Sequence, residues 1–270
     1  MDSMIKTIHQ ITAENMALKL KVPDTKDEIQ HLAETFNEML DRLGRAFKSQ
    51  KQLFEDISHE LKTPLTILKG EFEVALTKVR SADEYEAMLK SALEEINRIA
   101  KLAESLLLLA RLDSKEMTPQ KMDVDLNLMI KGIINNIKGL AELKGVRISF
   151  EIPTGELSLR GDENQLKTLF LNILDNAIKY TPHNGLIEVS TKRATSVANV
   201  SIKDTGIGIP GEDIGRIFDR FYRLDTSRDS IGFGLGLSIA KSIAEAHGGT
   251  IRASSEAAKG TTFIVSLPLY

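Results

Sequence analysis

Apolar side chains in the first half of the chain recur at alternating steps of three and four residues, which is the spacing of one helical face. The pattern predicts one long helix from about Asp27 to Val79, weakened only at Gly44 and Pro64, and a second helix that ends near Asp113. The apolar positions are Ile29, Leu32, Phe36, Met39, Leu43, Phe47, Leu53, Phe54, Ile57, Leu61, Leu65 and Leu68, then Leu89, Leu93, Ile96, Ile99, Ala103, Leu106 and Ala110. Such a hairpin leaves this apolar seam uncovered, so we expect two copies to pair as a homodimeric four-helix bundle.

Residues 1–46 have the pattern of two short helices joined by an extended connector. The first helix begins near Met4, and Pro23 prevents it from running directly into the next one. Asp24 or Thr25 is expected to cap the following helix. The segment is therefore predicted to be a small helical module that leads into the long helix.

Residues 124–270 alternate helical and strand patterns. Helices are predicted at 126–143, 165–180 and 235–246, and strands at 147–152, 156–160, 186–191, 197–203, 250–253 and 262–267. Helices grouped on one face of a mixed sheet form an α/β sandwich. Residues 114–123, which include Pro119, lose all periodicity and are predicted to be a linker. The chain is thus expected to be multi-domain, with a relay at 1–46, a helical hairpin at 47–113 and an α/β domain at 124–270.

Composition narrows the choice of partners. The 270 residues include 35 basic and 38 acidic side chains, a formal charge of -3, so neither a nucleic-acid partner nor an anionic membrane surface is implied. The chain has no cysteine, which excludes disulfides and cysteine-ligated metal. Its longest strongly apolar run, at 106–110, is far shorter than the ~20 residues of a membrane span. No membrane-spanning helix is therefore expected in this chain.

A candidate reactive histidine lies in the long helix. His59 is off the apolar stripe, Thr63 lies one turn further along the same face, and Glu60 is its neighbour in sequence. Pro64 lacks the amide that would bond to the carbonyl of Glu60, so the helix is expected to loosen or bend beside the histidine. A lone His-Glu pair is more often a solvated helix face, so this interpretation depends on motifs elsewhere. The other histidines show no metal-ligand spacing and are predicted to be structural or exposed: His9, His31, His183 and His247.

A second group of polar residues falls on one predicted helix. Asn172 and Asn176 are four residues apart, hence on one helical face, and their neutral oxygens suit a hard cation such as Mg²⁺. Lys179 supplies a point charge for phosphate, and Tyr180 supplies an aromatic surface for a purine. Taken singly, each is an ordinary residue of a helix surface.

Two glycine-rich turns follow this helix. The first begins with Asp204 directly after a strand, and its Gly206 and Gly208 let the backbone approach a ligand closely, while the carboxylate can accept from an exocyclic amine. The second, at 232–236, leads into a helix whose amide ends can hold phosphate. Arg223 lies between the turns and is a candidate phosphate clamp. A β-turn before a helix would also account for the glycines, so neither turn is specific by itself.

Together these motifs resemble a known family. The string Ser58-His-Glu-Leu-Lys-Thr-Pro-Leu-Thr66 resembles the phosphoacceptor signature of two-component sensor histidine kinases. In chain order, 172–180, 204–210, 218–223 and 232–238 resemble the N, G1, F and G2 boxes of the ATPase superfamily that joins these kinases to DNA gyrase, mismatch-repair ATPases and a heat-shock chaperone. The G2 box departs from the commoner form, because Ile231 stands where a glycine is frequent and Phe233 where a small polar residue is usual.

The resemblance implies a function and a set of site residues. His59 would take a phosphoryl group from ATP and pass it to an aspartate of a response regulator, and Glu60 would orient the imidazole and accept its proton. Thr63 is similar to the family position that places a water for dephosphorylation of the regulator. Asn176 and Asn172 would hold Mg²⁺. Contacts to ATP are implied for Asn172, Asn176, Lys179, Tyr180, Asp204, Gly206, Gly208, Arg223, Gly232, Gly234, Leu235, Gly236 and Leu237.

Residues 22–29 and the string Phe36-Asn-Glu-Met39 resemble the second half of a HAMP module, a relay that follows a membrane span in many receptors. This implies that the chain is the cytoplasmic portion of a bacterial inner-membrane receptor. Within the family the chain looks closest to the HAMP-containing class that partners winged-helix response regulators, and to its heavy-metal sensor branch.

Two other functions remain open on the sequence. One is an ATP-hydrolysing conformational machine on the same nucleotide fold, in which a glutamate four residues before the metal-binding asparagine activates water. Asn172 occupies that position here and cannot act as a base, which favours transfer to protein. The other is a nucleotide-binding scaffold in which His59 is inert.

Overall fold

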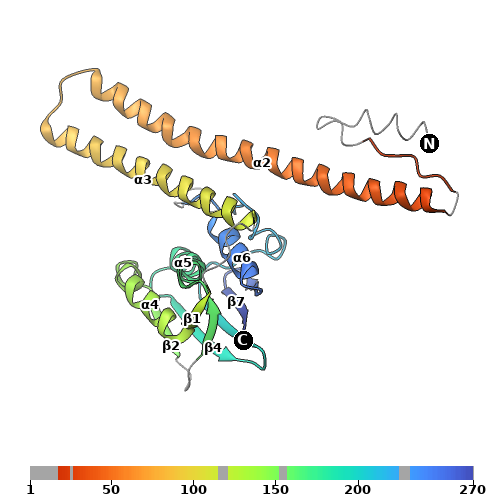
Figure 1. Ribbon diagram of the computed structural model, residues 1–270. Helices are drawn as coiled ribbons and strands as arrows, with labels where there is room; N and C mark the ends of the chain where they lie inside the picture. Colours follow the sequence, from red (N-terminus) through yellow and green to blue (C-terminus); the bar gives the residue numbers. More distant parts are fainter. Residues whose placement is uncertain (1–17, 25–26, 115–120, 152–156, 225–231, 270) are drawn as a thin grey trace. The chain divides into compact units, whose positions relative to one another are not determined.

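The computed structural model describes residues 18–24, 27–114, 121–151, 157–224 and 232–269. The chain divides into two compact units, Met1–Glu95 and Ile96–Tyr270, and each is described by itself (Figure 1). The short helix predicted near Met4 lies outside the described residues. Within the described residues, no helix combines the length and hydrophobicity needed to cross a bilayer.

The first unit is dominated by one helix, α2 (Glu28–Leu76), of 49 residues. Its N-cap is Asp27, whose Oδ1 accepts from the backbone N–H groups of Ile29 and Gln30 at 3.1 Å. The prediction of a cap at Asp24 or Thr25 was therefore wrong, because Asp27 is the residue whose carboxylate reaches the free amides of the first turn. The predicted continuous helix is confirmed, since α2 runs through Pro64 as one element.

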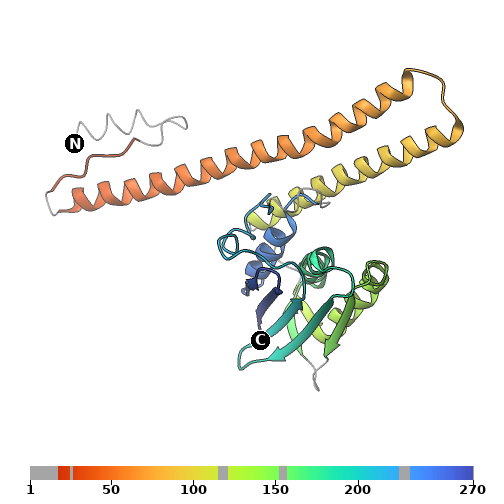
Figure 2. The same ribbon diagram turned by 180° about the vertical axis from the view of Figure 1, so that it is seen from behind.

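The helix α3 (Ala82–Asp113) follows, and within the first unit its residues 82–95 turn back beside α2. Figures 1 and 2 show this hairpin, whose turn lies at residues 77–81. Inside the first unit, the Ser91 hydroxyl donates to Glu71 Oε1 at 2.6 Å across the hairpin. Much of the predicted apolar seam remains exposed in the single chain, including Leu32, Met39, Leu43, Phe47, Phe54, Leu65, Leu89 and Leu93.

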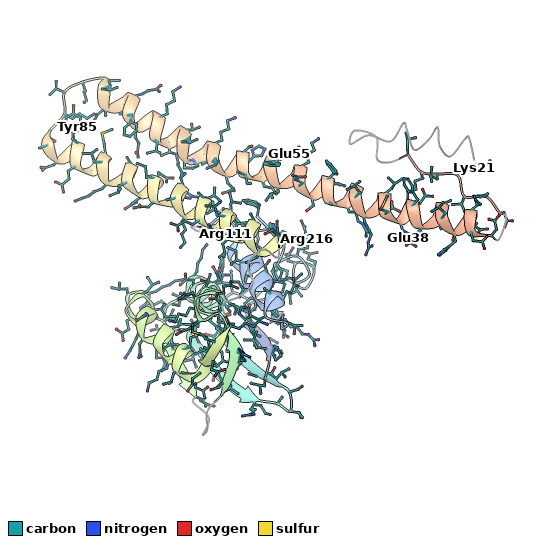
Figure 3. All side chains as sticks on the ribbon, in the orientation of Figure 1. Lys21, Glu38, Glu55, Tyr85, Arg111 and Arg216 are labelled. Carbon is teal, nitrogen blue, oxygen red and sulfur yellow. The ribbon has the colours of Figure 1, made fainter. Side chains whose placement is uncertain are left out.

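The connector before α2 is held by one asparagine. The Asn37 side chain accepts from the Leu20 N–H at 2.8 Å and donates to the Leu20 carbonyl at 2.9 Å, as a neighbouring strand would. Leu20 is buried against the same part of the helix, where Ala33 and Leu40 are also buried. In Figure 3 the labelled Lys21 lies on this connector and Glu38 lies on the adjoining part of α2. The extended connector predicted for this segment is thus present between residues 18 and 24.

The second unit contains an α/β domain after the end of α3. Its strands are β1 (Met122–Asp125), β2 (Arg147–Glu151), β3 (Ser158–Gly161), β4 (Leu186–Arg193), β5 (Val197–Asp204), β6 (Thr250–Glu256) and β7 (Gly260–Pro268), and its helices are α4 (Leu126–Leu143), α5 (Glu163–Tyr180) and α6 (Gly236–Ala246). Five strands form a sheet in the order β2-β4-β5-β7-β6, in which β2 and β4 are parallel and the other neighbours are antiparallel. The strands β1 and β3 form a separate antiparallel pair.

One face of the five-stranded sheet is buried. Along β5 every second side chain is buried, and Ile202 pairs across the sheet with Val189 of β4 and Phe263 of β7, which are also buried. The helices α4, α5 and α6 each bury an apolar stripe, and Figures 1 and 2 show them gathered on one side of the sheet. This confirms the predicted α/β sandwich, with a core between one sheet face and one helical layer.

The predicted elements of this domain match the observed ones to within a few residues, with one exception. The strand β1 begins at Met122, inside the segment predicted to be a linker. It pairs with β3, where Met122 faces Gly161 and Asp125 faces Ser158. A four-residue strand has too few positions to show a period, so its partner in the fold decides its structure.

A buried histidine, His247, connects the C-terminal end of α6 to the N-cap of α5. Its burial also makes the stability of the domain depend on pH. The Nε2 of His247 accepts from the Asp162 N–H at 3.0 Å, and Nδ1 lies 2.9 Å from the Ile243 carbonyl, to which its proton is donated. Burial holds the pKa of His247 below its ordinary value, against the opposing effects of the Ile243 carbonyl and the Asp162 carboxylate. The unfolded chain therefore binds the proton more readily than the folded one as the pH falls through ~6.5.

We therefore expect the free energy of unfolding to fall on acidification from pH 7.5 to 5.5, by up to ~1.4 kcal/mol per pH unit from this group. Thermal unfolding followed by circular dichroism measures the change. His247→Gln should flatten this dependence, whereas His31→Gln, at an exposed position of α2, should leave it as it is. An equal slope in the wild type and His247→Gln would contradict this assignment.

Candidate functional site

The candidate reactive histidine is accessible. His59 and Thr63 are exposed on α2, Glu60 is half-buried, and Pro64 is buried. The neighbouring hydroxyl of Ser58 donates to the carbonyl one turn back, but in the described part of the chain the Thr63 hydroxyl has no hydrogen-bond partner. The imidazole and the Thr63 hydroxyl are thus both available to an incoming group.

His59 also forms one end of an open groove on the surface of α2, with a volume of about 530 Å³. The groove is lined by Phe47, Gln50, Lys51, Phe54, Glu55, Ser58 and His59. Its aromatic side chains belong to the apolar seam. The candidate reactive side chain therefore borders a surface that is partly apolar and partly charged.

The two asparagines of α5 lie on the face predicted for them. Asn172 Nδ2 donates to the Thr168 carbonyl at 3.0 Å, which fixes the amide and directs Oδ1 away from its own helix. A Cβ atom added to Gly236 would lie 3.0 Å from this Oδ1, so the start of α6 packs directly on Asn172. Asn176, one turn further along α5, is half-buried. This brings the N box and the G2 turn together.

Asp204 ends β5 on the buried face of the sheet and is 4% exposed. Its Oδ1 accepts from the Gly206 N–H at 2.8 Å and from the Thr261 N–H at 3.2 Å. Burial raises the pKa of the Asp204 carboxyl, and the two amides only partly oppose this effect. Both of these hydrogen bonds fall on Oδ1, so the carboxylate is held in one orientation by the protein backbone.

The glycines of the G1 loop (residues 204–210) have different roles. A Cβ on Gly206 would lie 2.6 Å from Asp204 Oδ1 and 2.7 Å from the Tyr180 carbonyl oxygen, so this glycine allows α5 and Asp204 to approach each other. Gly208 has φ +70, and a Cβ there would lie 2.1 Å from the Glu256 carbonyl oxygen. Gly208 is thus required for packing of the loop on the β6–β7 turn, whatever the ligand.

The last turn of α5 meets both glycine-rich segments. The Tyr180 carbonyl accepts from the Ile207 N–H of the G1 loop at 3.2 Å. The Lys179 ammonium lies 5.2 Å from the centre of the Tyr180 ring, and a Cβ on Gly232 would lie 3.3 Å from the same ammonium. The Lys179 ammonium, the Tyr180 ring and the backbones of both glycine-rich loops therefore lie together at the C-terminal end of α5.

The G2 loop (residues 232–238) leads into α6. Gly234 has φ +70, and its carbonyl accepts from the Phe221 N–H of the F box at 3.1 Å. Arg223 and Leu237 are half-buried, whereas Leu235 is 3% exposed, so any contribution of Leu235 to a ligand site comes from its backbone. Leu235 is the N-cap of α6, and its side chain makes no hydrogen bond to the first backbone N–H groups of that helix.

Sequence reasoning missed the hairpin that supports Asp204. Besides the Thr261 amide, Ser255 Oγ accepts from the Ile209 N–H at 2.8 Å, and the Ile207 carbonyl accepts from the Ala258 N–H at 2.7 Å. A Cβ on Gly260 would lie 2.0 Å from the Asp204 carbonyl oxygen. Only Gly260 gave an indication in the sequence, because a glycine after a strand marks a tight approach of the backbone.

Within the second unit, the end of α3 contacts two of the motifs. The Arg98 guanidinium lies 5.3 Å from the centre of the Phe233 ring in the G2 loop. The Asp113 carboxylate accepts two hydrogen bonds of 2.7 Å from Arg220 of the F box. Phe233 is 9% exposed and packs against Arg98. The sequence had shown this residue only as a departure from the family pattern of the G2 box.

Three known domain families match the chain. Residues 1–45 match the HAMP domain, and residues 49–115 match the His Kinase A (phospho-acceptor) domain, which includes His59. Residues 161–270 match the histidine kinase-, DNA gyrase B-, and HSP90-like ATPase, which includes the N, G1, F and G2 boxes. The three matches occur in the order predicted from the motifs. The chain belongs to the two-component sensor histidine kinases.

Individual sensor histidine kinases are similar to most of the chain. It is 35% identical over 268 residues to the sensor histidine kinase CusS of Escherichia coli (strain K12), which is 98% of this chain and 55% of CusS. It is 38% identical over 264 residues to the signal transduction histidine-protein kinase ArlS of Staphylococcus aureus (strain USA300), which is 97% of this chain and 58% of ArlS. The chain therefore spans little more than half the length of these relatives.

The fold is shared with solved sensor histidine kinases. The crystal structure of histidine kinase ThkA in complex with response regulator protein TrrA matches with a TM-score of 0.69 and 23% identity, over 90% of this chain and 68% of the ThkA chain. The likeness at this identity concerns the fold alone. It agrees with the helical hairpin and α/β sandwich described above.

The residues of α5 in this chain also fit a hydrated cation. In the described part of the chain, no group of three or more His, Cys, Asp or Glu side chains could hold a metal ion. Asn172 and Asn176 offer amide oxygens on one face of α5, and Mg²⁺ commonly takes few protein ligands beside phosphate oxygens and water. These two side chains are the candidate ligands.

Proposed function

We propose that this chain is a protein histidine kinase that moves the γ-phosphoryl group of ATP to His59 and then to an aspartate of a response regulator. The observation that carries the proposal is the gathering of Asp204, the α5 residues and both glycine-rich loops at one place, in a chain that also exposes His59. The family matches over residues 49–115 and 161–270 support it.

The chemistry at His59 follows from its neighbours. A ring nitrogen of the neutral imidazole attacks the γ-phosphorus in line, forming a P–N bond as the bond between this phosphorus and the oxygen that leaves with ADP breaks. The proton on the other ring nitrogen passes to the Glu60 carboxylate, which also selects the tautomer. Exposure of His59 allows the group to arrive and later to leave.

The nucleotide is held by the α/β domain. The Asp204 carboxylate accepts from the adenine amino group, Tyr180 offers an aromatic face, and Lys179 a positive charge for phosphate. Gly232, Gly234, Gly236 and the first amides of α6 face the phosphates, as Leu235 and Leu237 do with their backbone, and Arg223 serves as a phosphate clamp. Bound by Asn172 and Asn176, Mg²⁺ would neutralise phosphate charge.

The partner is proposed to be the receiver domain of a response regulator. ThkA was solved in complex with the response regulator protein TrrA, which supports this class of partner here. The phosphoryl group on His59 passes to the regulator's aspartate, where a P–O bond forms as the P–N bond breaks. Of the groove beside His59, the polar lining at Lys51, Glu55 and Ser58 is the part proposed to stay open to the partner.

We also propose that two copies pair through the apolar seam. Leu32 and Phe54 are 62% and 60% exposed on α2, and Leu89 is 66% exposed on α3, so the single chain leaves large apolar side chains in water. A second hairpin packed against the first would cover them as a four-helix bundle. Sedimentation of the purified chain would test this stoichiometry.

The HAMP match at 1–45 supports the proposal that the chain is the cytoplasmic portion of a membrane-anchored receptor. The proposed division is a relay at 1–46, a hairpin at 47–113, a linker that ends before β1, and a catalytic domain that runs from β1 at Met122 to residue 270. The match to CusS is consistent with the heavy-metal sensor branch.

One labelling experiment tests the proposal. The chain is incubated with Mg·ATP that carries the label on the γ-phosphate, and the labelled protein is treated with acid or base. We expect a label on the protein that is lost in acid and kept in base, as a phosphoramidate requires. Release of labelled phosphate without labelled protein would favour the hydrolysing machine, and nucleotide binding with neither product would favour the scaffold.

Thr63 should separate two activities of the hairpin. Thr63→Ala is expected to keep autophosphorylation within about twofold and to lose dephosphorylation of the regulator, because the free hydroxyl can place a water while alanine cannot. Alanine suits an exposed helical position, so the fold should be retained. Thr66→Ala is the control, because the Thr66 hydroxyl already donates to the Lys62 carbonyl. Equal loss of both activities in Thr63→Ala would refute the separation.

A further inference from the structure

The C-terminal end of α5 has a complete set of partners for its carbonyl groups. The Ala177 carbonyl accepts from the backbone and the hydroxyl of Thr181, and the Tyr180 carbonyl accepts from the Ile207 N–H of the G1 loop. The two carbonyls between them, of Ile178 and Lys179, accept from one ammonium group, that of Lys144. The last four carbonyls of a helix have no partner within the helix, so Lys144 satisfies half of this set.

Lys144 reaches this position from another element. It follows α4 directly, and its own N–H donates to the Leu140 carbonyl at 3.2 Å. Gly145, with φ +68, then turns the chain, and its carbonyl accepts from the Asn184 N–H at 2.8 Å. The ends of α4 and α5 are therefore joined by the backbone, and the Lys144 ammonium lies 2.7 Å from the Ile178 carbonyl oxygen.

The positive charge of Lys144 interacts both with the C-terminal end of α5 and with a neighbouring cation. A cation near the C-terminal end of a helix interacts favourably with the helix dipole, and it forms stronger hydrogen bonds than a neutral donor. Burial lowers the pKa of Lys144, and the nearby Lys179 ammonium lowers it further. Two cations thus lie near each other at the end of α5, and only Lys179 has a role in the proposed nucleotide site.

We propose that Lys144 is a positioning residue of the nucleotide site. Its ammonium caps α5 and thereby sets the place of Lys179 and Tyr180 against the G1 loop. The inference rests on the proposed binding of ATP by this domain. Lys144 acts through the backbone of α5, since its hydrogen bonds end on the carbonyls of Ile178 and Lys179.

Three variants test the inference in the full chain. Lys144→Met keeps most of the length of the side chain and removes its donors. Lys144→Arg keeps charged donors, and Lys138→Met is the matched control on α4. Lys138 is exposed and pairs only at 3.8 Å with Glu142, one turn away. Calorimetric titration with the non-hydrolysable analogue AMPPNP and Mg²⁺ gives the affinity, and autophosphorylation gives KM and kcat.

For Lys144→Met we expect about tenfold weaker AMPPNP binding and a similar rise in KM, with kcat within about twofold, since the lost bonds are charge-assisted. Lys144→Arg should recover most of the affinity, and Lys138→Met should match the wild type. A purely structural role predicts a lower melting temperature with unchanged affinity of the folded protein. That result, or arginine no better than methionine, would overturn the inference.

Two further outcomes are distinguishable. If Lys144→Met does not fold, Lys144→Gln replaces it. Glutamine keeps a neutral donor on a side chain one bond shorter, so a smaller loss of AMPPNP affinity with unchanged kcat is expected, and an affinity equal to that of the wild type would contradict the inference. If the wild type binds AMPPNP and the variants bind equally well, this inference fails alone. Failure of the wild-type chain to bind AMPPNP would overturn the proposed function together with the inference.

Discussion

His59→Gln is expected to abolish labelling of the chain by γ-labelled ATP, while AMPPNP binding stays within about twofold of the wild type. Glutamine is polar and of similar reach, but its amide nitrogen is not a nucleophile, so no P–N bond can form. The side chain is exposed on α2, and substitutions at such positions change stability by only ~0.5 kcal/mol or less. The measurement is the labelled fraction after gel separation, beside the calorimetric affinity.

The control for this prediction is His31→Gln. His31 is also exposed on α2 but has no acidic neighbour in sequence. The hydroxyl one turn along, that of Thr35, already donates its proton to the His31 carbonyl. His31→Gln should be labelled like the wild type. Persistence of an acid-labile label in His59→Gln would show that another residue accepts the phosphoryl group.

Asp204→Asn is expected to weaken AMPPNP binding at least about 100-fold, or ~3 kcal/mol, with little loss of the fold. The amide oxygen of asparagine can keep both hydrogen bonds from the Gly206 and Thr261 amides, because these end on Oδ1 alone. The other atom then becomes an NH₂ group, which is a donor placed opposite the adenine amino group. Two donors cannot form a hydrogen bond with each other, and an unpaired donor is costly at a side chain that is only 4% exposed.

The readout for Asp204→Asn is calorimetric titration, with circular dichroism to confirm that the α/β domain is folded. Asp123→Asn is a matched control, since Asp123 is exposed on β1. A second comparison uses GTP, which carries a carbonyl where ATP carries the amino group. Asp204→Asn should bind ATP less tightly than the wild type does. Its preference for ATP over GTP, measured as the ratio of the two affinities, should also be smaller. Unchanged ATP affinity would remove Asp204 from the site.

The sequence predicted most of the helices and strands because their hydrophobic periods are long. The helix α4 matches its predicted range of 126–143, and α2 was predicted to run without a break past Pro64. The errors came from short features. The cap of α2 lies at Asp27, and β1 lies in a segment with no period, because both depend on which hydrogen-bonding partner is near in space.

The candidate motif residues could be named from the sequence, but the residues that hold them in position could not. Asn172 and Asp204 could be named as candidates because the strings that contain them resemble nucleotide-binding motifs of the family. Thr261 and Lys144 could not, since a threonine in a strand and a lysine after a helix are ordinary residues. Their importance arises from hydrogen-bond partners that lie more than 30 residues away in sequence, the Asp204 carboxylate for Thr261 and the Ile178 carbonyl for Lys144.

By itself the sequence determined the family of this protein, the order of its matched domains, the candidate reactive histidine and the candidate polar residues of the nucleotide motifs. It could do so because periodicity and motif spacing are local properties of the chain. Only the tertiary structure decided which glycine serves packing and which serves close approach, how Asp204 is oriented, and which lysine caps α5. These depend on where backbone amides and carbonyls from distant segments are left without partners, and folding alone brings those segments together.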